Sequence, residues 1–548
     1  MNVAETLIKY FKSNIGLSNV YVYPGGTIAP LANACNKFGI NINVFKSEQG
    51  AGFAALGASL ASTKPSICFV TSGPGVTNIL TCLADAYYDS VPLIILTGQV
   101  GTSDLERNPN LRQRGFQETP TISLCKPISK AVFSLEKNMS DRSIKDLVDS
   151  ALKVSISNRK GPVVIDCPMD LQLSDLYEGS QSVSSLNLLI EDNFNRNKSS
   201  VAQPDYKLII KDLIESKKPA ILVGGGVSKQ TSKLVRNIIS SYFKNIALIY
   251  SLRGLSTCST QHPSYCGYIG HTGNVLANNI LDDSDFLICL GTRLDIRQTG
   301  SEFKNFSKNK KIILVNNDNE ELKSVRIEIK NKYSMDCDEF VQNLKKYSSG
   351  LDKNINSKKW FSQYKEKSIL KEDPDIPNVS GLNPAKSISF LLDAFNKLNQ
   401  NKIISTGVGS HQHWTMRNLK FESDNDILLT SAGHGTMGYD IPTAIGAAIE
   451  CPNKIPICVC GDGSFFMNGF EIVKALELNQ NFKLILIKNK SLGIVSTFQN
   501  WKFGNRFMTS NFQSANLENI LLGMGMSFVK TCKSEKELNL FYLDFVNS

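Results

Sequence analysis

Short apolar runs alternate with helical patterns along most of the chain. The runs SICFVTSG (66–73) and PLIILTGQ (92–99) flank a helical segment, and AILVGGG (220–226) and IPICVCGDG (455–463) repeat the pattern further on. Short, continuously apolar runs that end in Gly, Asn or Asp are typical of strands in a parallel sheet buried on both faces. The pattern predicts an α/β protein of three consecutive doubly wound domains with mostly parallel sheets.

Two polar stretches divide this pattern. Residues 178–204 are rich in Ser and Asn, and residues 346–378 mix charged residues with Gly and Pro. Both compositions are typical of linkers, and the blocks between them have the usual size of domains. We therefore expect domains at 1–180, 190–345 and 370–548.

The composition is that of an ordinary globular protein, since 42% of the 548 residues are hydrophobic and 20% are charged. No apolar stretch approaches the ~20 residues that cross a bilayer. The first residues, MNVAETLIKYFKSNIG, have the pattern of an amphipathic helix and lack the regions of a signal peptide. We therefore expect a mature cytoplasmic chain without membrane contact.

The charge and the cysteines exclude further classes. The thirteen cysteines include no C-x-x-C pair, which indicates reduced thiols rather than disulfides or a zinc site. The formal net charge of +10 is spread over lysines that form no basic stripe, so we expect no nucleic acid as a partner. All five histidines lie beyond residue 261. Chemistry in the first half must therefore work without histidine.

The first candidate for chemistry is the GDG segment around Asp462. Asp462 follows one predicted strand and Asn489 ends the next, so a βαβ unit places both side chains at the same carboxyl edge of the sheet. A carboxylate and an amide oxygen suit Mg²⁺, and Gly461 and Gly463 allow a diphosphate to approach the backbone. The ordinary alternative is a tight turn with an Asp cap.

The second candidate is Glu48, which opens a helix of small residues, GAGFAALGA (50–58). Another backbone or domain could pack closely on such a helix. From position alone, Glu48 is equally an acidic residue favoured in a first helical turn by the helix dipole.

Several segments resemble a known family. The chain resembles the pyrimidine-binding domain of thiamine diphosphate enzymes at YPGG (Tyr23–Gly26), SEQGAGFAALGAS (Ser47–Ser59), TSGPGVTN (Thr71–Asn78) and FQE (Phe116–Glu118). It resembles their diphosphate-binding domain at SAGHGTMGYDIPTAIGAA (Ser431–Ala448) and at GDGSFFMNGFEI with the later IKNKSLGIV. The likeness is in particular to the large, catalytic subunit of acetolactate synthase, and it runs in order over nearly the whole chain.

The resemblance implies a role for Glu48. In this family such a glutamate hydrogen-bonds the cofactor's aminopyrimidine, and the cofactor supplies the carbon nucleophile and the electron sink for decarboxylation of a 2-oxo acid. Gly26, Phe116 and Gln117 would belong to the same catalytic region. The family's site lies between two subunits, so a homodimer or homotetramer is implied, and a small regulatory subunit is a further partner by likeness.

The resemblance also assigns binding residues. Asp462, Asn489 and the backbone carbonyl of Ser491 would hold Mg²⁺, and Met437 would support the bent cofactor, although core filling is its ordinary role. His434 stands where acetolactate synthases usually have an apolar residue. The residues expected to bind thiamine diphosphate are Pro24, Gly25, Pro74, Asn78, Gly409, His411, Gln412, Gly435, Met437, Gly461, Gly463 and Ser464.

The middle part of the chain resembles the FAD-binding segments of acetolactate synthase. The segments are VGGGV (223–227), YIGHTGNVLANN (268–279), LGTRLDIRQTG (290–300) and VNNDNEEL (315–322). A vestigial α/β domain without flavin is the alternative. The residues expected near FAD are Gly224, Gly225, Gly226, Arg293, Arg297, Asp318 and Asp336.

Four departures from the family concern the acceptor side. Ser47 replaces the usual His before the catalytic Glu, Phe498 replaces a Trp that favours 2-oxobutyrate, and the loop Arg107–Gly115 is unlike the family's. The sequence also stops at FYLDFVNS, where the family continues into a tail that closes over the cofactor, so the tail is missing or the chain is shortened.

The expected activity is therefore carboligation. Decarboxylation of pyruvate and transfer of the two-carbon unit to a second 2-oxo acid would give 2-acetolactate, a step of branched-chain amino acid synthesis. The alternatives are transfer to another carbonyl such as a keto-sugar nucleotide, a simple decarboxylase or oxidase, and an inactive structural or regulatory homologue. The presence of Glu48, Asp462 and Asn489 argues against the inactive homologue.

Overall fold

The computed structural model describes residues 1–179, 203–351, 359–369, 381–398, 400–421, 423–504, 506–513 and 515–548. Most of the predicted linker 178–204, and 352–358 and 370–378 of the predicted linker 346–378, lie outside the described residues. The domain limits at 180, 190 and 370 fall there too and stay a prediction.

By its internal contacts the chain divides into two compact units. The first comprises Met1–Arg196, Lys402–Gly409 and Leu429–Val529, and the second comprises Asn197–Asn401, Ser410–Leu428 and Lys530–Ser548. Three parallel-sheet α/β modules are found in the described chain, which confirms the predicted fold class.

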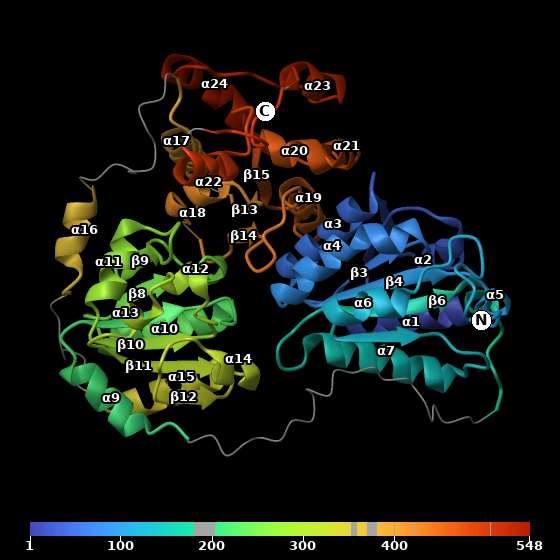
Figure 1. Ribbon diagram of the computed structural model, residues 1–548, viewed down its shortest axis with the longest axis horizontal. Coiled ribbons are helices and arrows are strands. Elements are labelled where there is room, and N and C mark those ends of the chain that lie inside the picture. The colour runs from blue at the N-terminus through green and yellow to red at the C-terminus, as the bar shows by residue number, and fades with distance from the viewer. Residues whose placement is uncertain are drawn as a thin grey trace. The chain divides into compact units, whose positions relative to one another are not determined.

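The N-terminal module, residues 1–179, contains a six-stranded sheet of order β2-β1-β3-β4-β6-β5 in which every neighbouring pair is parallel (Figure 1). The strands are β1 (Asn19–Val22), β2 (Asn41–Val44), β3 (Ser66–Val70), β4 (Leu93–Gln99), β5 (Ala131–Ser134) and β6 (Val163–Pro168). The helices are α1 (Val3–Ile15), η1 (Gly26–Ile28), α2 (Ala29–Lys37), α3 (Glu48–Ser62), α4 (Pro74–Tyr88), α5 (Thr102–Leu105), α6 (Thr121–Cys125), η2 (Lys126–Ile128), α7 (Asp141–Ile156) and α8 (Met169–Leu173).

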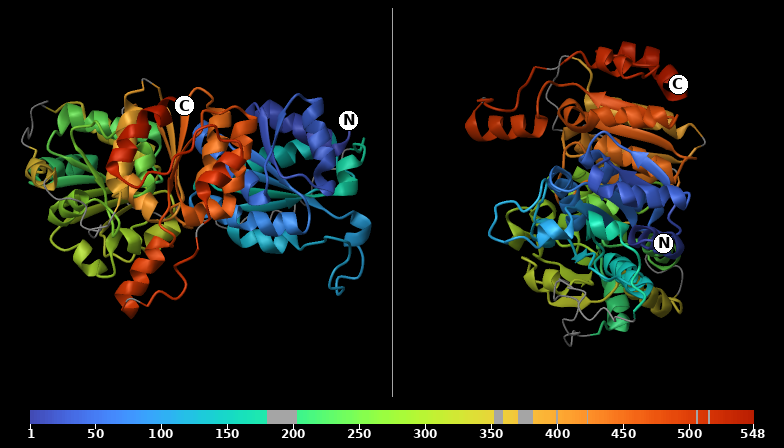
Figure 2. Two further views of the ribbon diagram at one scale, coloured as in Figure 1. Left: turned by 90° about the horizontal axis from the view of Figure 1, so that it is seen from above. Right: turned by 90° about the vertical axis from the view of Figure 1, so that its right-hand side faces the viewer.

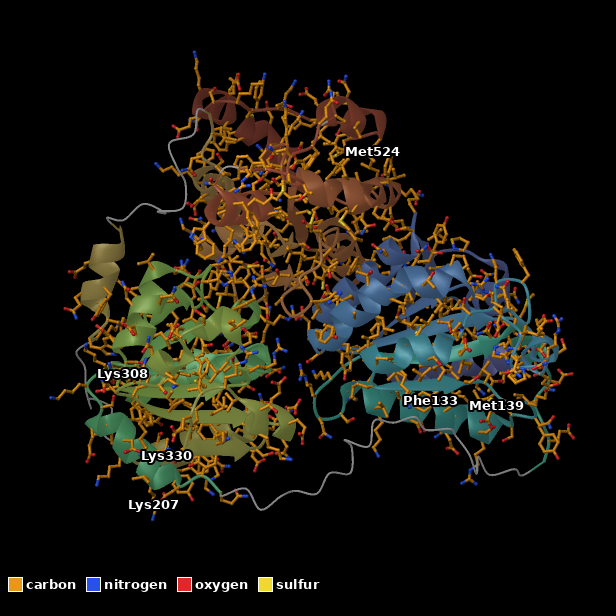
Figure 3. The ribbon with its side chains drawn as sticks, in the orientation of Figure 1. Phe133, Met139, Lys207, Lys308, Lys330 and Met524 are labelled. Atoms are coloured by element: carbon orange, nitrogen blue, oxygen red, sulfur yellow. The ribbon has the colours of Figure 1, made fainter. Side chains whose placement is uncertain are left out.

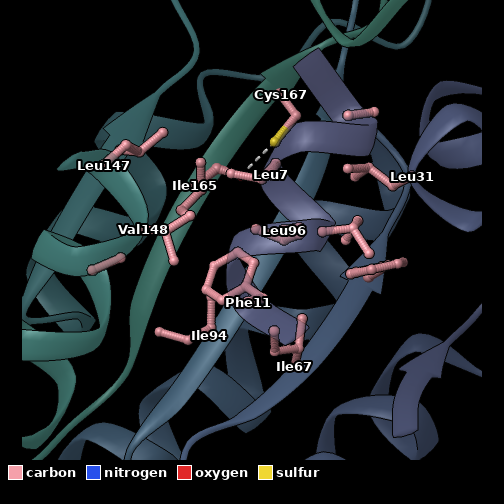
Figure 4. Close-up of a cluster of buried hydrophobic side chains, with 14 of the residues drawn as sticks. Leu7, Phe11, Leu31, Ile67, Ile94, Leu96, Leu147, Val148, Ile165 and Cys167 are labelled. Atoms are coloured by element: carbon pink, nitrogen blue, oxygen red, sulfur yellow. Dashed lines mark hydrogen bonds between the residues drawn. The ribbon is translucent and has the colours of Figure 1, made fainter. Parts of the chain in front are cut away.

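Helices cover both faces of this sheet. On one face α1, α2, α7 and α8 enclose a core in which Leu7 and Phe11 of α1 meet Ile94 and Ile165 of the strands (Figure 4). Full burial of each such side chain contributes roughly 1.5–3 kcal/mol. Helix α1 begins where the Asn2 side chain accepts a hydrogen bond from Glu5 N, which confirms the predicted amphipathic helix at this end.

The first compact unit also contains most of the C-terminal sheet, of order β14-β13-β15-β16, in which β13–β15 and β15–β16 are parallel pairs. Its strands are β13 (Lys402–Thr406), β14 (Ile427–Thr430), β15 (Ile455–Gly461) and β16 (Lys483–Ile487). The helices in the same unit are α19 (Asp440–Glu450), α20 (Asp462–Asn468), η5 (Gly469–Glu471), α21 (Ile472–Glu477), α22 (Gly493–Phe503) and α23 (Leu517–Gly523).

Helix α3 packs closely on α19, which joins the two sheets of the first compact unit. A Cβ on Gly57 would overlap the backbone of Thr443, and a Cβ on Gly446 would overlap the backbone of Ala54. Only glycine at these two positions permits the approach of the backbones. The prediction that another backbone packs on the small-residue helix is confirmed.

The middle module, residues 203–351, has a six-stranded sheet of order β12-β11-β10-β7-β8-β9, again parallel throughout. Its strands are β7 (Pro219–Val223), β8 (Ala247–Tyr250), β9 (Tyr265–Tyr268), β10 (Phe286–Leu290), β11 (Lys311–Asn316) and β12 (Asn331–Ser334). Its helices are α9 (Tyr206–Glu215), α10 (Lys229–Tyr242), η4 (Arg253–Thr257), α11 (Val275–Asp283), α12 (Ile296–Thr299), α13 (Phe303–Phe306), α14 (Asn319–Ser324) and α15 (Cys337–Ser348). The second compact unit adds α16 (Ser362–Ile369), α17 (Pro384–Asn396), α18 (Ser410–Arg417) and α24 (Glu535–Asn547).

The surface and the thiols agree with the composition. None of the thirteen cysteines forms a disulfide, and all but Cys451 and Cys532 are buried. Lys207, Lys308 and Lys330 are exposed on the middle module (Figure 3). Among the described residues, no helix is long and apolar enough to span a membrane.

Candidate cofactor-binding site

Glu48 lies at the carboxyl edge of the N-terminal sheet. It is the first residue of α3, its side chain is 7% exposed, and Asn78 Nδ2 donates a hydrogen bond to its Oε2 at 3.0 Å. Glu48 follows β2 and Asn78 lies in the helix after β3, and both strands flank β1. The parallel strands on the two sides of β1 therefore bring these two predicted residues together.

Two loops of the same edge are joined by hydroxyl groups. Pro24, Gly25 and Gly26 lead into η1, and the Thr27 hydroxyl beside them bonds to Thr71 Oγ1 at 2.9 Å and accepts from Ser72 N at 3.0 Å. This contact holds the loop after β1 against the start of α4, whose first residue is the predicted Pro74. The Ser72 hydroxyl is buried and has no hydrogen-bond partner among the described residues, so it is free to bond a ligand.

The FQE segment meets the edge through Gln117 only. Gln117 has a φ of 63°, and a Cβ on Gly73 would lie 3.0 Å from Gln117 Cβ. Phe116, in contrast, is 87% exposed. Arg114 and Glu118 hold this loop by an ion pair of 2.6 Å, and the loop stands out from the N-terminal module in both views of Figure 2.

Asp462 and Asn489 lie at the carboxyl edge of the C-terminal sheet. The Asp462 carboxylate is 1% exposed and accepts hydrogen bonds from Gly463 N at 3.0 Å and Lys490 N at 2.8 Å. Asn489 Oδ1 accepts from Ser491 N at 3.1 Å. Burial raises the pKa of Asp462 above its usual value, and the backbone donors counteract that rise. The carboxylate thus links the loops after β15 and β16.

Four further predicted residues lie around Asp462. Gly461 precedes α20, and a Cβ on Gly463 would lie 3.3 Å from Met437 Cε. The Ser464 hydroxyl accepts from Gly438 N at 2.7 Å and donates to Asp440 Oδ1 at 2.6 Å. The GTMG loop is therefore tied to the start of α20.

Two aspartates that the sequence did not indicate, Asp85 of α4 and Asp89 at its C-terminal cap, hold this loop. The Ser431 hydroxyl donates to Asp85 Oδ2 at 2.8 Å and accepts from the backbone N of Gly435 at 3.0 Å. Asp89 accepts from Ala432 N at 2.9 Å and Gly433 N at 2.7 Å. The only sign of this role in the sequence is that the two acidic residues are four positions apart. A solvent-exposed helix face has the same spacing of acidic residues. His434 stacks on Tyr88, with ring centroids 5.5 Å apart.

The remaining diphosphate residues divide between the compact units. Gly409 belongs to the first unit. His411 and Gln412 lie in the first turn of α18 in the second unit, with side chains 5% and 0% exposed.

The triple glycine of the middle module is occupied by contacts within the fold. Gly224 N donates to Leu290 O at 2.8 Å and Gly226 N donates to Gly291 O at 2.9 Å. A Cβ on Gly224 would overlap Gly291 O, and one on Gly225 would overlap the Arg253 side chain. Glycine is needed here so that the loops after β7 and β10 can pack together.

The charged residues expected near FAD have different surroundings. Arg293 lies 3.3 Å from Asp295 and 4.0 Å from Glu321. Asp318 and Asp336 accept hydrogen bonds at the starts of α14 and α15, so both are helix caps.

Arg297 lies near two histidines, His271 and His413. Its field lowers the pKa values of His271 and His413, although burial is the larger cause in both. The two imidazole rings are 6.5 Å apart, and His413 Nε2 is buried without a partner among the described residues. These side chains fit an anionic ligand, whereas the glycine amides of Gly224 and Gly226 do not.

Comparison with known proteins decides the family. The chain matches the N-terminal thiamine pyrophosphate (TPP) binding domain of thiamine pyrophosphate enzymes over residues 1–124, their central domain over 207–344 and their C-terminal TPP binding domain over 407–540. A probable acetolactate synthase large subunit of Methanococcus aeolicus is 33% identical, covering 94% of this chain and 85% of its own length. The chain belongs to the thiamine pyrophosphate enzyme family.

Two further relatives of this thiamine pyrophosphate enzyme have similar coverage. The acetolactate synthase large subunit of Lactococcus lactis is 32% identical over 94% of this chain and 86% of its own length. The isozyme 2 large subunit of Escherichia coli is 29% identical over 92% and 86%. The predicted family resemblance and thiamine pyrophosphate as the cofactor are thereby confirmed.

The residues of this thiamine pyrophosphate enzyme fit the diphosphate and a magnesium ion. Asp462, Asn489 and Ser491 offer a carboxylate, an amide oxygen and a backbone carbonyl, and no group of three or more His, Cys, Asp or Glu that could hold a metal occurs in the described part of the chain. Mg²⁺ commonly uses one or two carboxylates together with phosphate oxygens. The buried hydroxyl of Thr436 has no partner among the described residues and lies in the same loop as Met437.

Proposed function

We propose that this thiamine pyrophosphate enzyme decarboxylates pyruvate and transfers the two-carbon unit to a second 2-oxo acid, which gives 2-acetolactate. The observation that carries the proposal is the match over 94% of the chain to a probable acetolactate synthase large subunit. Glu48 and Asp462 lie within the matches to the N-terminal and C-terminal TPP binding domains, and both are buried at the carboxyl edge of a sheet. The relatives are named as large subunits, and this supports a small regulatory subunit as a partner.

In this proposal the chain's own residues hold and orient the cofactor. Bound thiamine diphosphate supplies an electron sink for the loss of CO₂. Glu48 would exchange a proton with the pyrimidine, and Asn78 keeps its carboxylate in one direction. Asp462, Asn489 and the Ser491 carbonyl would hold Mg²⁺, and Met437 would support the cofactor from the side of Gly463.

The acceptor would bind near Gln117 and Phe498. Phe498 is 51% exposed on α22, where it packs edge-on against Phe503 and Trp501. Helix α22 and the loop that carries Phe116 stand out on the same side of the first compact unit in both views of Figure 2.

These exposed aromatic side chains support a homodimer in which a second copy covers them and completes the site. A homotetramer would contain two such pairs. We propose FAD as an additional ligand of the middle module, supported by Arg297 and by His413 Nε2, which has no partner among the described residues.

Product analysis tests the proposal. Purified protein is incubated with pyruvate, thiamine diphosphate, Mg²⁺ and FAD, and CO₂ and 2-acetolactate are measured together. Equal molar amounts of the two products are expected, because each 2-acetolactate is formed with the release of one CO₂. CO₂ release that requires a keto-sugar nucleotide would instead establish the alternative acceptor, which the exposed Phe498 and the altered loop favour. Absence of CO₂ with every acceptor would refute both.

A further inference from the structure

The turn that begins α3, and therefore carries Glu48, is held by a carboxylate from the other end of the chain. Glu471 ends η5 and is 1% exposed. Its Oε2 accepts a hydrogen bond from Lys46 N at 2.9 Å, and its Oε1 accepts one from the Ser47 hydroxyl at 2.9 Å. The same hydroxyl accepts from Gly50 N at 2.9 Å and so caps the helix.

The fit of Glu471 depends on the residues around it. A Cβ on Gly50 would overlap the Glu471 carboxylate, so the glycine leaves room for it at the first turn. Burial raises the pKa of Glu471, and the donors from Lys46 and Ser47 counteract that rise. The positive end of the α3 dipole also favours the ionised carboxylate. A second link, Lys46 Nζ to Glu477 Oε1 at 2.7 Å, is exposed on both sides and contributes little.

We propose that Glu471 is a positioning residue for Glu48, acting through Ser47. This inference rests on the proposed function, in which Glu48 contacts the cofactor. Glu471 fixes Lys46 and Ser47, the two residues that precede Glu48, and thereby the direction in which the Glu48 side chain leaves the helix.

The proposal gives the unusual Ser47 a role. A hydroxyl at this position can accept from Gly50 N and donate to Glu471 at the same time, which the structure shows. Asp462 begins α20, and Glu471 ends η5, which follows α20 directly. One short stretch of chain therefore contains both a candidate magnesium ligand and the support of a catalytic acid.

The first test uses protein without cofactor. Hydrogen–deuterium exchange of the peptide covering Lys46 to Gly50 is compared between wild type and Glu471→Gln. The glutamine can accept only one of the two hydrogen bonds, so exchange is expected to be about 10-fold faster. Glu477→Gln, which removes only the exposed ion pair, is the matched control and should exchange like wild type.

The second test uses thiamine diphosphate and Mg²⁺ without substrate. Exchange of the cofactor's thiazolium C2 proton with solvent reports on activation by Glu48 alone. A misplaced catalytic group costs up to about 100-fold, so we expect this rate and kcat to fall about 10- to 100-fold in Glu471→Gln and Ser47→Ala, with KM for pyruvate within about 3-fold. Ser47→Thr keeps the hydroxyl and should restore both rates.

The outcomes separate this inference from the proposed function. Wild-type C2 exchange and kcat in a folded Glu471→Gln or Ser47→Ala variant would overturn the positioning role while leaving the function intact. A thermal midpoint that drops with unchanged rates would also overturn it, because Glu471 would then be merely structural. Wild-type protein that activates C2 but releases no CO₂ would refute the proposed function and leave the positioning role to be decided by the C2 rates of the variants.

Discussion

The sheet edge that carries Glu48 and the sheet edge that carries Gly224–Gly226 look alike in sequence. Each includes a glycine-rich loop that follows a buried strand, β3 at the first edge and β7 at the second. Their contacts differ. At the first edge, Asn78 directs the Glu48 carboxylate and the Ser72 hydroxyl is buried without a partner in the described chain. At the second, two of the three glycine amides bond to carbonyls of the neighbouring loop.

The difference teaches that a glycine-rich loop at a carboxyl edge is not by itself a binding site. Buried polar groups are nearly always satisfied, so a ligand site is indicated where some remain without partners after folding. At the N-terminal edge such a group is the Ser72 hydroxyl, which lies in the glycine-rich loop itself. In the second compact unit one such group is His413 Nε2, away from the triple glycine in sequence. The following predictions test this contrast, beginning with the largest effect.

Glu48→Gln should abolish decarboxylation while leaving the fold intact. The amide cannot exchange a proton with the pyrimidine, and loss of general acid–base catalysis costs about 10²- to 10⁴-fold. CO₂ release from pyruvate measures the effect, and far-UV circular dichroism checks the fold. Glu106→Gln, an exposed substitution in the same module, should behave as wild type. Turnover near normal in Glu48→Gln would show that this edge is not catalytic.

Asp462→Ala should weaken the joint binding of Mg²⁺ and thiamine diphosphate. Because even residues behind a metal ligand change affinity about 10- to 100-fold, removal of a direct ligand should cost at least about 100-fold. Calorimetric titration of thiamine diphosphate at fixed Mg²⁺ measures this. Asp336→Ala, which removes a helix cap in the other compact unit, provides the contrast and should leave the affinity for thiamine diphosphate unchanged.

His413 should make the second compact unit less stable in acid. Burial lowers its pKa to about 3 in the folded chain, so the neutral form is required. The contribution of neutral His413 to the free energy of unfolding is fully present above pH 6.5. It is lost as the pH falls from 6.5 toward 3, and the loss is about 2 kcal/mol at pH 5. Urea unfolding at pH 7 and pH 5 should show a smaller loss in His413→Gln than in wild type. His434 is exposed, and His434→Gln is the control. If it reduces the loss of stability between pH 7 and pH 5 as much as His413→Gln does, burial of His413 does not cause that loss.

The positions of candidate residues at the sheet edges could be predicted from the sequence, since a residue that follows a buried apolar run of an α/β pattern lies at the carboxyl edge of the sheet. Asp462 and Asn489 were expected together because each ends an apolar run, and the structure brings them together. The contact of Gly224 with Gly291 could not be predicted, because it depends on which two loops meet in space. The role of Asp85 was equally hidden, since its partner Ser431 is far away in the chain.

The smallest effect separates the two roles suggested for Asp318. As the cap of α14 it accepts hydrogen bonds from Glu320 N and Glu321 N, and replacing such a cap by Ala costs about 1 kcal/mol, whereas Asn caps equally well. Asp318→Ala should therefore lower the stability of the middle module and Asp318→Asn should not. If Asp318 only caps the helix, FAD affinity, measured by flavin fluorescence, should be the same in wild type and Asp318→Asn. A weaker affinity in Asp318→Asn at unchanged stability would show instead that the carboxylate contacts FAD, and the middle edge would then resemble the edge of Glu48.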